Sequence, residues 1–138
     1  MNTRSNIEIK DGIARISLDD GKVNAMSTEM MGELNLDLSE EASAVTILTG
    51  RPGIFSAGFD LATLNRGSDA MLAMLRTGAE LILRLLAFPR PVVIACTGHA
   101  YHMGAFITLA SDVRFAVAEN WRIGMNEVAI GLTVPGCE

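Results

Sequence analysis

The sequence predicts a single α/β domain in which helices cover a sheet that contains parallel strands. Apolar periodicity gives the element order β-β-α-β-α-β-α-β, with no internal repeat and no linker. The run from Val92 to Thr97 is β-branched and apolar on both faces, as expected of a parallel strand that is covered on both sides. A chain of 138 residues that is 49% hydrophobic is long enough to build one such core.

The first elements predict a β-hairpin. Ile7 to Lys10 and Ile13 to Leu18 flank Asp11-Gly12, a dipeptide that favours a two-residue turn. Such a turn sets the cross-strand register, so an apolar face and one pair of opposite charges can be assigned. The predicted apolar face has Ile9 opposite Ala14 and Ile7 opposite Ile16, with Leu18 beyond them, and the charge pair on the other face is Glu8 with Arg15.

A helix and a strand are predicted next. Ser27 is placed to cap the helix, and Glu29 lies in its first turn, where a carboxylate is favoured. The helix is expected to span about eleven to fourteen residues. Ala44 to Thr49 then reads as a short strand, ended by the turn residues from Gly50 to Gly53. The buried face of the helix is predicted to consist of Met30, Met31, Leu34, Leu38 and Ala42.

A second helix is predicted from Asp69 to Phe88, capped by Ser68 and ended by Pro89. Its expected buried face is Leu72, Leu75, Ala79, Ile82, Leu83 and Leu86. Beyond the strand from Val92, the remaining elements are a break at Gly98 to Gly104, a short helix from Ala105 to Ala110 and a strand from Val113 to Ala118.

Composition excludes several classes of partner. The net charge is -5 and no Lys/Arg cluster occurs, so nucleic acid is not an expected ligand. The longest apolar runs are far shorter than the ~20 residues of a membrane span. The first twenty residues alternate and do not form a signal peptide. Cys96 and Cys137 match no metal or redox spacing, so we expect reduced thiols in a cytoplasmic protein.

Two predicted loops follow strands and lead into helices, where α/β folds often bind ligands. In the first, Ile54 to Leu61, Ala57-Gly58 allows close approach of the backbone to a ligand, and Asp60 can cap the following segment. An ordinary glycine turn with a capping aspartate explains the same residues.

The second loop, Gly98 to Ala105, ends at the start of a helix, where free N–H groups can hold a developing oxyanion. It contains His99 and His102, the two histidines of the chain. Apart from Cys96, which stands inside an apolar run, no Cys or carboxylate lies near them in sequence to complete three or four metal ligands, so lining or structural roles are favoured over metal binding.

Glu127 is the third candidate. It is followed directly by Val128 to Ile130, and desolvation by such neighbours raises the pKa of a carboxyl towards the range useful for proton transfer. A solvent-facing glutamate at a helix start accounts for the pattern equally well.

In order and spacing, these segments resemble the crotonase, or enoyl-CoA hydratase/isomerase, superfamily. The segments that carry the resemblance are Gly21 to Met26, Phe55 to Leu61 and Asn126 to Leu132. The resemblance implies the crotonase-like ββα spiral over residues 1–138 as a single domain. Because family members continue into further helices that complete the acyl pocket, this domain is expected to be incomplete at its C-terminus. For a full-length chain the family also implies a homo-oligomer, a trimer or a hexamer.

The resemblance further implies an acyl-CoA thioester as substrate, with no separate cofactor and no metal. The carbonyl oxygen of the thioester would accept hydrogen bonds from the amides of Ala57 and Met103, Met103 replacing a glycine that is frequent in the family. The residues expected to bind the substrate are Lys22, Asn24, Ala25, Gly58, Phe59, Asp60, Gly104 and Phe106.

The acid/base residues differ from those of the hydratases in that superfamily, which use two glutamates. Phe106 stands where the first glutamate belongs, and Glu127 keeps the place of the second. One glutamate can move a proton between two carbons, which resembles the isomerases that convert 3-enoyl-CoA into 2-enoyl-CoA. The alternatives are an atypical hydratase and a non-catalytic, truncated acyl-CoA-binding protein.

Overall fold

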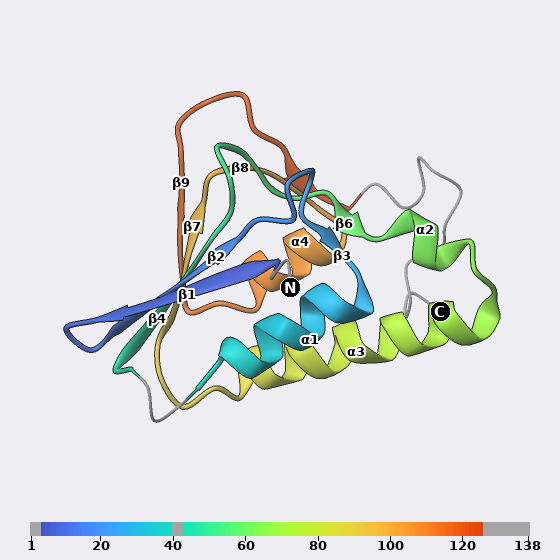
Figure 1. The fold of residues 1–138 in the computed structure, drawn as a ribbon. Coiled ribbons are helices and arrows are strands. Elements are labelled where there is room, and N and C mark those ends of the chain that lie inside the picture. The colour runs from blue at the N-terminus through green and yellow to red at the C-terminus, as the bar shows by residue number, and fades with distance from the viewer. Residues whose placement is uncertain (1–3, 40–42, 126–138) are drawn as a thin grey trace.

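The computed structural model describes residues 4–39 and 43–125. A five-stranded sheet with the order β1-β2-β4-β7-β9 forms the main layer, and only its first pair is antiparallel (Figure 1). The helices α1 (Thr28–Asp37) and α3 (Ser68–Leu86) lie side by side along one side of the molecule. The strands of the main sheet are β1 (Ser5–Lys10), β2 (Ile13–Leu18), β4 (Val45–Thr49), β7 (Val92–Cys96) and β9 (Val113–Ala116).

The hairpin of β1 and β2 has the predicted turn and register. Asp11 and Gly12 have φ angles of 52° and 78°, and Glu8 lies opposite Arg15. Ile9 pairs with Ala14 as predicted, but its side chain is 52% exposed and does not join the core. The reason is that the tip of the hairpin projects beyond the helices, which leaves its outer positions uncovered (Figure 1).

The first helix has the predicted cap and buried face but is shorter than predicted, with ten residues from Thr28 to Asp37. Ser27 is the N-cap residue, and its Oγ accepts a hydrogen bond of 3.1 Å from the amide of Met30. This bond satisfies one of the amides that a helix start leaves without an intrahelical partner. The predicted core positions Met30, Met31, Leu34 and Leu38 are all buried, and Ala42 lies outside the described residues.

The second predicted helix is present as α3, and of its predicted buried face Ile82 packs against the core, but none of the predicted positions is fully buried. Its buried residues are Met74, Gly78, Leu81 and Leu85, whereas the predicted Leu72, Leu83 and Leu86 are 58%, 65% and 65% exposed. The helix turns Gly78 inwards because the ring of Phe59 packs against it. The contact is so close that a Cβ at position 78 would lie 3.1 Å from that ring. The expected cap is also absent, since Ser68 is the first helical residue and Gly67 is the N-cap.

Both predicted ligand loops contain short strands that the sequence analysis missed. β8 (Gly98–Tyr101) lies between β5 (Gly53–Ser56) and β10 (Ile123–Gly124) in a small parallel sheet. β3 (Ala25–Met26) pairs in parallel with β6 (Gly58–Phe59). Strands of two to four residues are too short to show an alternating pattern.

Two short helices remain among the described elements. α2 (Leu61–Leu64) follows β6, and α4 (Met103–Leu109) replaces the helix predicted from Ala105 to Ala110. Cys96 is a buried free thiol whose pKa is raised by burial, and Cys137 lies outside the described residues. No helix within residues 4–39 and 43–125 is long and apolar enough to cross a membrane.

Candidate functional site

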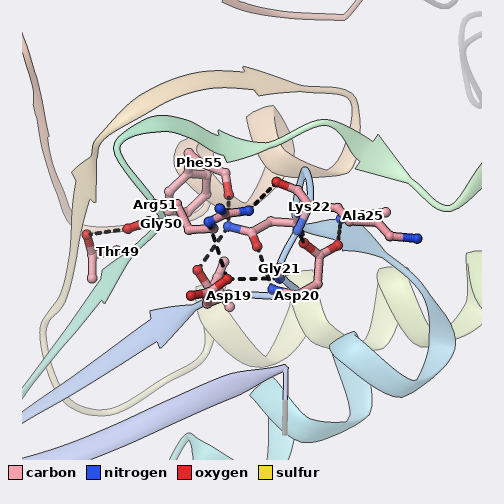
Figure 2. A network of polar contacts seen from close by, with 11 residues as sticks. Asp19, Asp20, Gly21, Lys22, Ala25, Thr49, Gly50, Arg51 and Phe55 are labelled. Atoms are coloured by element: carbon pink, nitrogen blue, oxygen red, sulfur yellow. Dashed lines mark hydrogen bonds and ion pairs between the residues drawn. The ribbon is translucent and has the colours of Figure 1, made fainter. Parts of the chain in front are cut away.

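The loop between β2 and β3 is folded around Asp20. The carboxylate of Asp20 accepts hydrogen bonds from the amides of Lys22, Asn24 and Ala25, at 2.7, 2.9 and 3.0 Å (Figure 2). Partial burial opposes ionisation of this group, but the amide donors outweigh it and hold the pKa of Asp20 below its ordinary value. Arg51 closes the loop from outside, where it contacts Asp19 and the carbonyl of Lys22.

Asn24 joins this loop to β5. Its side chain is fully buried, and its Nδ2 donates to the carbonyls of Leu18 at 2.9 Å and Phe55 at 3.1 Å. Its own carbonyl accepts a bond of 2.7 Å from the Oγ of Ser56. Its φ of 52° is left-handed, a conformation that asparagine tolerates better than most residues. Asn24 therefore fixes the loop, while Lys22 remains exposed.

The segment after β5 brings several predicted site residues together. Ala25 pairs with Gly58 and Met26 with Phe59. The strand that ends the loop between β2 and β3 therefore lies directly beside the first candidate ligand loop. Asp60 caps α2 as predicted, and accepts bonds from the Thr63 hydroxyl at 2.6 Å and the Thr63 amide at 2.9 Å. The Thr63 hydroxyl bond lowers the pKa of Asp60, against a smaller effect of burial.

The amides of this segment point in different directions. The amide of Ala57 donates to the carbonyl of Val23 at 3.0 Å, and that of Gly58 donates to the Oγ of Ser56 at 3.1 Å. The amide of Asp60 donates to the carbonyl of Met26 on β3 at 3.3 Å. Because successive amides of a strand point to opposite edges, the amide of Phe59 in β6 faces away from β3. Ala57 can act as a donor to a ligand only by giving up its bond to Val23.

The second candidate segment packs against the first with little space between them. A Cβ at Gly58 would lie 2.7 Å from the Cβ of His102, and a Cβ at Gly104 would lie 2.7 Å from that of Ser56. Met103 is the first residue of α4, and the first bond of the helix runs from the amide of Phe106 to the carbonyl of His102. The amide of Met103 therefore has no acceptor within the helix. Phe106 is partly buried and packs on the core.

The other histidine of this segment, His99, belongs to an aromatic cluster. Its ring stacks on Tyr101 and meets Trp121 edge to face, with ring centroids 5.6 and 5.1 Å apart. Its Nδ1 accepts the amide of Arg122 at 3.1 Å, which gives this side chain a structural role. In the part of the chain that the structure describes, no group of three His, Cys, Asp or Glu residues could hold a metal ion.

Glu127 lies outside the described residues. The chain shortly before it is described, since β10 pairs with β8 through Ile123 with Ala100 and Gly124 with Tyr101. The carbonyl of Gly124 accepts the amide of His102 at 3.1 Å. Gly124, three residues before Glu127, thus lies beside the start of α4.

The contributions of Asp20, Arg51 and His102 were not predicted from the sequence. An available signal was the turn sequence from Asp19 to Gly21, because aspartate in a turn commonly accepts amides two residues further on. The left-handed backbone of His102 had no comparable signal.

Comparison with known proteins identifies the family. A family model described as enoyl-CoA hydratase/isomerase matches residues 8–138. The chain belongs to this family, the crotonases, and has their mixed α/β fold. An apo structure of an enoyl-CoA isomerase of Mycobacterium tuberculosis is 45% identical, with a TM-score of 0.90, over 98% of this chain and 60% of that chain.

Curated relatives include enzymes named for two different reactions. The 2,3-dehydroadipyl-CoA hydratase of Escherichia coli K12 is 32% identical over 113 residues, which cover 82% of this chain and 43% of the relative. The mitochondrial enoyl-CoA delta isomerase 1 of Homo sapiens is 33% identical over 132 residues, which cover 90% of this chain and 43% of the relative. The chain thus spans somewhat less than half the length of these relatives.

Proposed function

We propose that the protein binds an acyl-CoA thioester and isomerises 3-enoyl-CoA to 2-enoyl-CoA through an enolate. The observation that carries this proposal is the close packing of Gly58 against His102, which brings the backbone amides of β6 and of the start of α4 to one place. Two such donors can stabilise the negative charge that develops on the thioester oxygen when a proton leaves the neighbouring carbon.

We assign the donors to Phe59 and Met103. Ala57 was the donor expected from the sequence, but its amide is bonded to the carbonyl of Val23. The amide of Phe59 is directed away from β3, and that of Met103 has no acceptor within α4. The remaining residues of the loops, Lys22, Asn24, Ala25, Gly58, Asp60 and Gly104, are proposed to shape the cradle for the CoA moiety.

Proton transfer is assigned to Glu127 as a single base. Phe106 supplies no carboxylate at the position where the hydratases of this family have one, and it packs on the core. A phenyl ring neither holds nor deprotonates water, so addition of water is expected to be slow. Glu127 can take a proton from one carbon and return it to another without a second carboxylate.

The test is an assay of the purified protein with 3-enoyl-CoA and 2-enoyl-CoA side by side. We expect isomerisation of 3-enoyl-CoA to exceed hydration of 2-enoyl-CoA by about 10²-fold, the lower end of what one acid/base group contributes. Hydration as fast as isomerisation contradicts the assignment.

An atypical hydratase is the second candidate, favoured by the relatives that are named hydratases at similar identity. The variant Phe106→Glu separates the two. If the protein is a single-base isomerase, a second carboxylate should raise hydration, with Phe106→Gln as the control that adds polarity without a base. A Phe106→Glu variant that folds and hydrates no faster favours the hydratase, in which another group positions the water.

The assembly and the location of the protein complete the proposal. We propose that the full-length protein forms a trimer or hexamer, because the exposed leucines of α3 (Leu72, Leu83 and Leu86) offer apolar surface for association. We also propose a cytoplasmic location, as the cysteine usage suggests. A non-catalytic acyl-CoA-binding protein is the remaining alternative. Intact mass together with light scattering tests the assembly, and a monomeric species without turnover supports the alternative.

A further inference from the structure

His102 has an unusual backbone conformation for its residue type. Its φ is 47° and its ψ is −116°, immediately before the first residue of α4. Within the described residues two other non-glycine residues have positive φ, namely Asp11 and Asn24. Asp11 lies in the hairpin turn and Asn24 is held by its buried hydrogen bonds. His102 lies instead at the junction of β8 and α4, where its side chain makes no helix-capping hydrogen bond.

The side chain of His102 fills the space beside Gly58. A Cβ at Gly58 would lie 2.7 Å from the Cβ and 2.9 Å from the Cδ2 of His102, and 2.9 Å from the carbonyl oxygen of Tyr101. Gly58 itself has a φ of 95°. The imidazole therefore packs against the backbone of β6 one residue before Phe59, whose amide is one proposed donor.

The backbone of His102 connects two further elements. Its amide donates to the carbonyl of Gly124 in β10 at 3.1 Å, and its carbonyl accepts the amide of Phe106 in α4 at 3.0 Å. Its side chain is only partly buried. His102 thus contacts β6 through its side chain, and it contacts β10 and α4 through its backbone. It also directly precedes Met103, the second proposed donor.

We propose that His102 is a positioning residue that sets the separation of the Phe59 and Met103 amides, an inference that rests on the proposed function. Left-handed backbone in a non-glycine residue is unfavourable and persists only where the surroundings enforce it, commonly at functional sites. A displacement of about 1 Å in a catalytic arrangement lowers turnover by about 10²-fold. The packed imidazole prevents such a displacement of β6 towards α4.

The test is the variant His102→Gly in the full protein. Glycine adopts a φ of 47° without strain, so the backbone and the melting temperature are expected to be kept while the packing is lost. We expect kcat for enoyl-CoA to fall by about tenfold or more and KM to change by less than about threefold, because donor geometry matters most in the transition state. His102→Asn, which fills part of the space but keeps the strained backbone, should have an intermediate kcat.

Asp11→Gly is the matched control, because it relieves a φ of 52° in the hairpin turn, outside the site. Its kcat and KM should equal those of the wild type. A His102→Gly variant with wild-type kcat overturns the proposal. So does a melting temperature that falls in His102→Gly and not in Asp11→Gly, since His102 would then act on folding.

A readout without turnover separates this inference from the proposed function. In ¹⁵N-labelled protein, His102→Gly should shift the amide resonances of Phe59 and Met103 and leave that of Gly32 in α1 unchanged. If the wild type converts no enoyl-CoA, the proposed function fails, and the amide shifts alone then decide the positioning role. Unchanged resonances at both donors overturn it.

Discussion

The loop from Asp19 to Ala25 and the segment from Gly98 to Gly104 both border the candidate site, but different forces hold them. Polar side chains fix the loop, since Asp20 binds three amides and Asn24 binds two carbonyls. Close backbone packing fixes the segment, since Gly98 and Gly104 leave no room for a Cβ. The loop should therefore be sensitive to lost hydrogen bonds, and the segment to added volume.

The largest effect is expected from Gly98→Ala. The new methyl group would overlap the carbonyl of Gly53 and the amide nitrogen of Ile54, and neither backbone can move without opening the β5–β8 pair. We expect a loss of about 3 kcal/mol or more in the free energy of unfolding, measured with urea. Gly32→Ala in α1, where a Cβ meets nothing within 4 Å, should be neutral or slightly stabilising. Equal stability of the two variants contradicts the packing argument.

Asn24→Ala should have the next largest effect. It leaves the buried carbonyls of Leu18 and Phe55 without their donor and places alanine at a left-handed φ. The expected cost is about 2–3 kcal/mol in the free energy of unfolding. Asn6→Ala, at an exposed position of β1, is the control and should change it by less than about 0.5 kcal/mol. A loop that tolerates both changes equally is not held by Asn24.

The pH dependence of stability tests the Asp60 cap. Its folded-state pKa lies below the ordinary value of 3.8, so ionised Asp60 contributes stability above that value and loses it as the pH falls through the folded pKa. Asparagine caps helices about as well but does not ionise. The wild type should exceed Asp60→Asn in stability at neutral pH, and the difference should shrink below pH 3.8 in chemical denaturation. A difference that is independent of pH rules out the ionised cap.

The smallest effect is expected from Asp19→Asn. The ion pair between the Nε of Arg51 and the Oδ1 of Asp19 is 3.3 Å long, and the Asp19 side chain is 62% exposed. Asparagine also retains an Oδ1 to accept the amide of Gly21. We expect a change below about 1 kcal/mol that decreases further at high salt. A larger loss that high salt abolishes would mean that charge, and not the Asp20 and Asn24 bonds, holds the loop.

The parts of the fold that local chemistry encodes could be predicted from the sequence. Asp11-Gly12 specifies its turn and register, and Ser27 caps α1 within four residues of chain. The orientation of α3 could not be predicted, because apolar residues occur on more than one of its faces. The choice depends on Gly78, which admits Phe59, a contact between distant parts of the chain.

The candidate site divides in the same way. The sequence correctly indicated the cap at Asp60. The sequence could not indicate which amide is available to bind a ligand, because every residue except proline has a backbone amide. The direction in which each amide points follows only from the pairing of β3 with β6. Ala57 was thus expected as a donor although its amide is bonded to Val23.

The most direct test of the proposed mechanism is the isomerase turnover of Glu127→Gln, measured with 3-enoyl-CoA in the full active assembly beside the wild type. Glutamine preserves the size of the side chain but does not accept a proton. The account predicts that kcat falls by at least about 10²-fold while the affinity for acyl-CoA changes little. Normal turnover in the Glu127→Gln variant would contradict it.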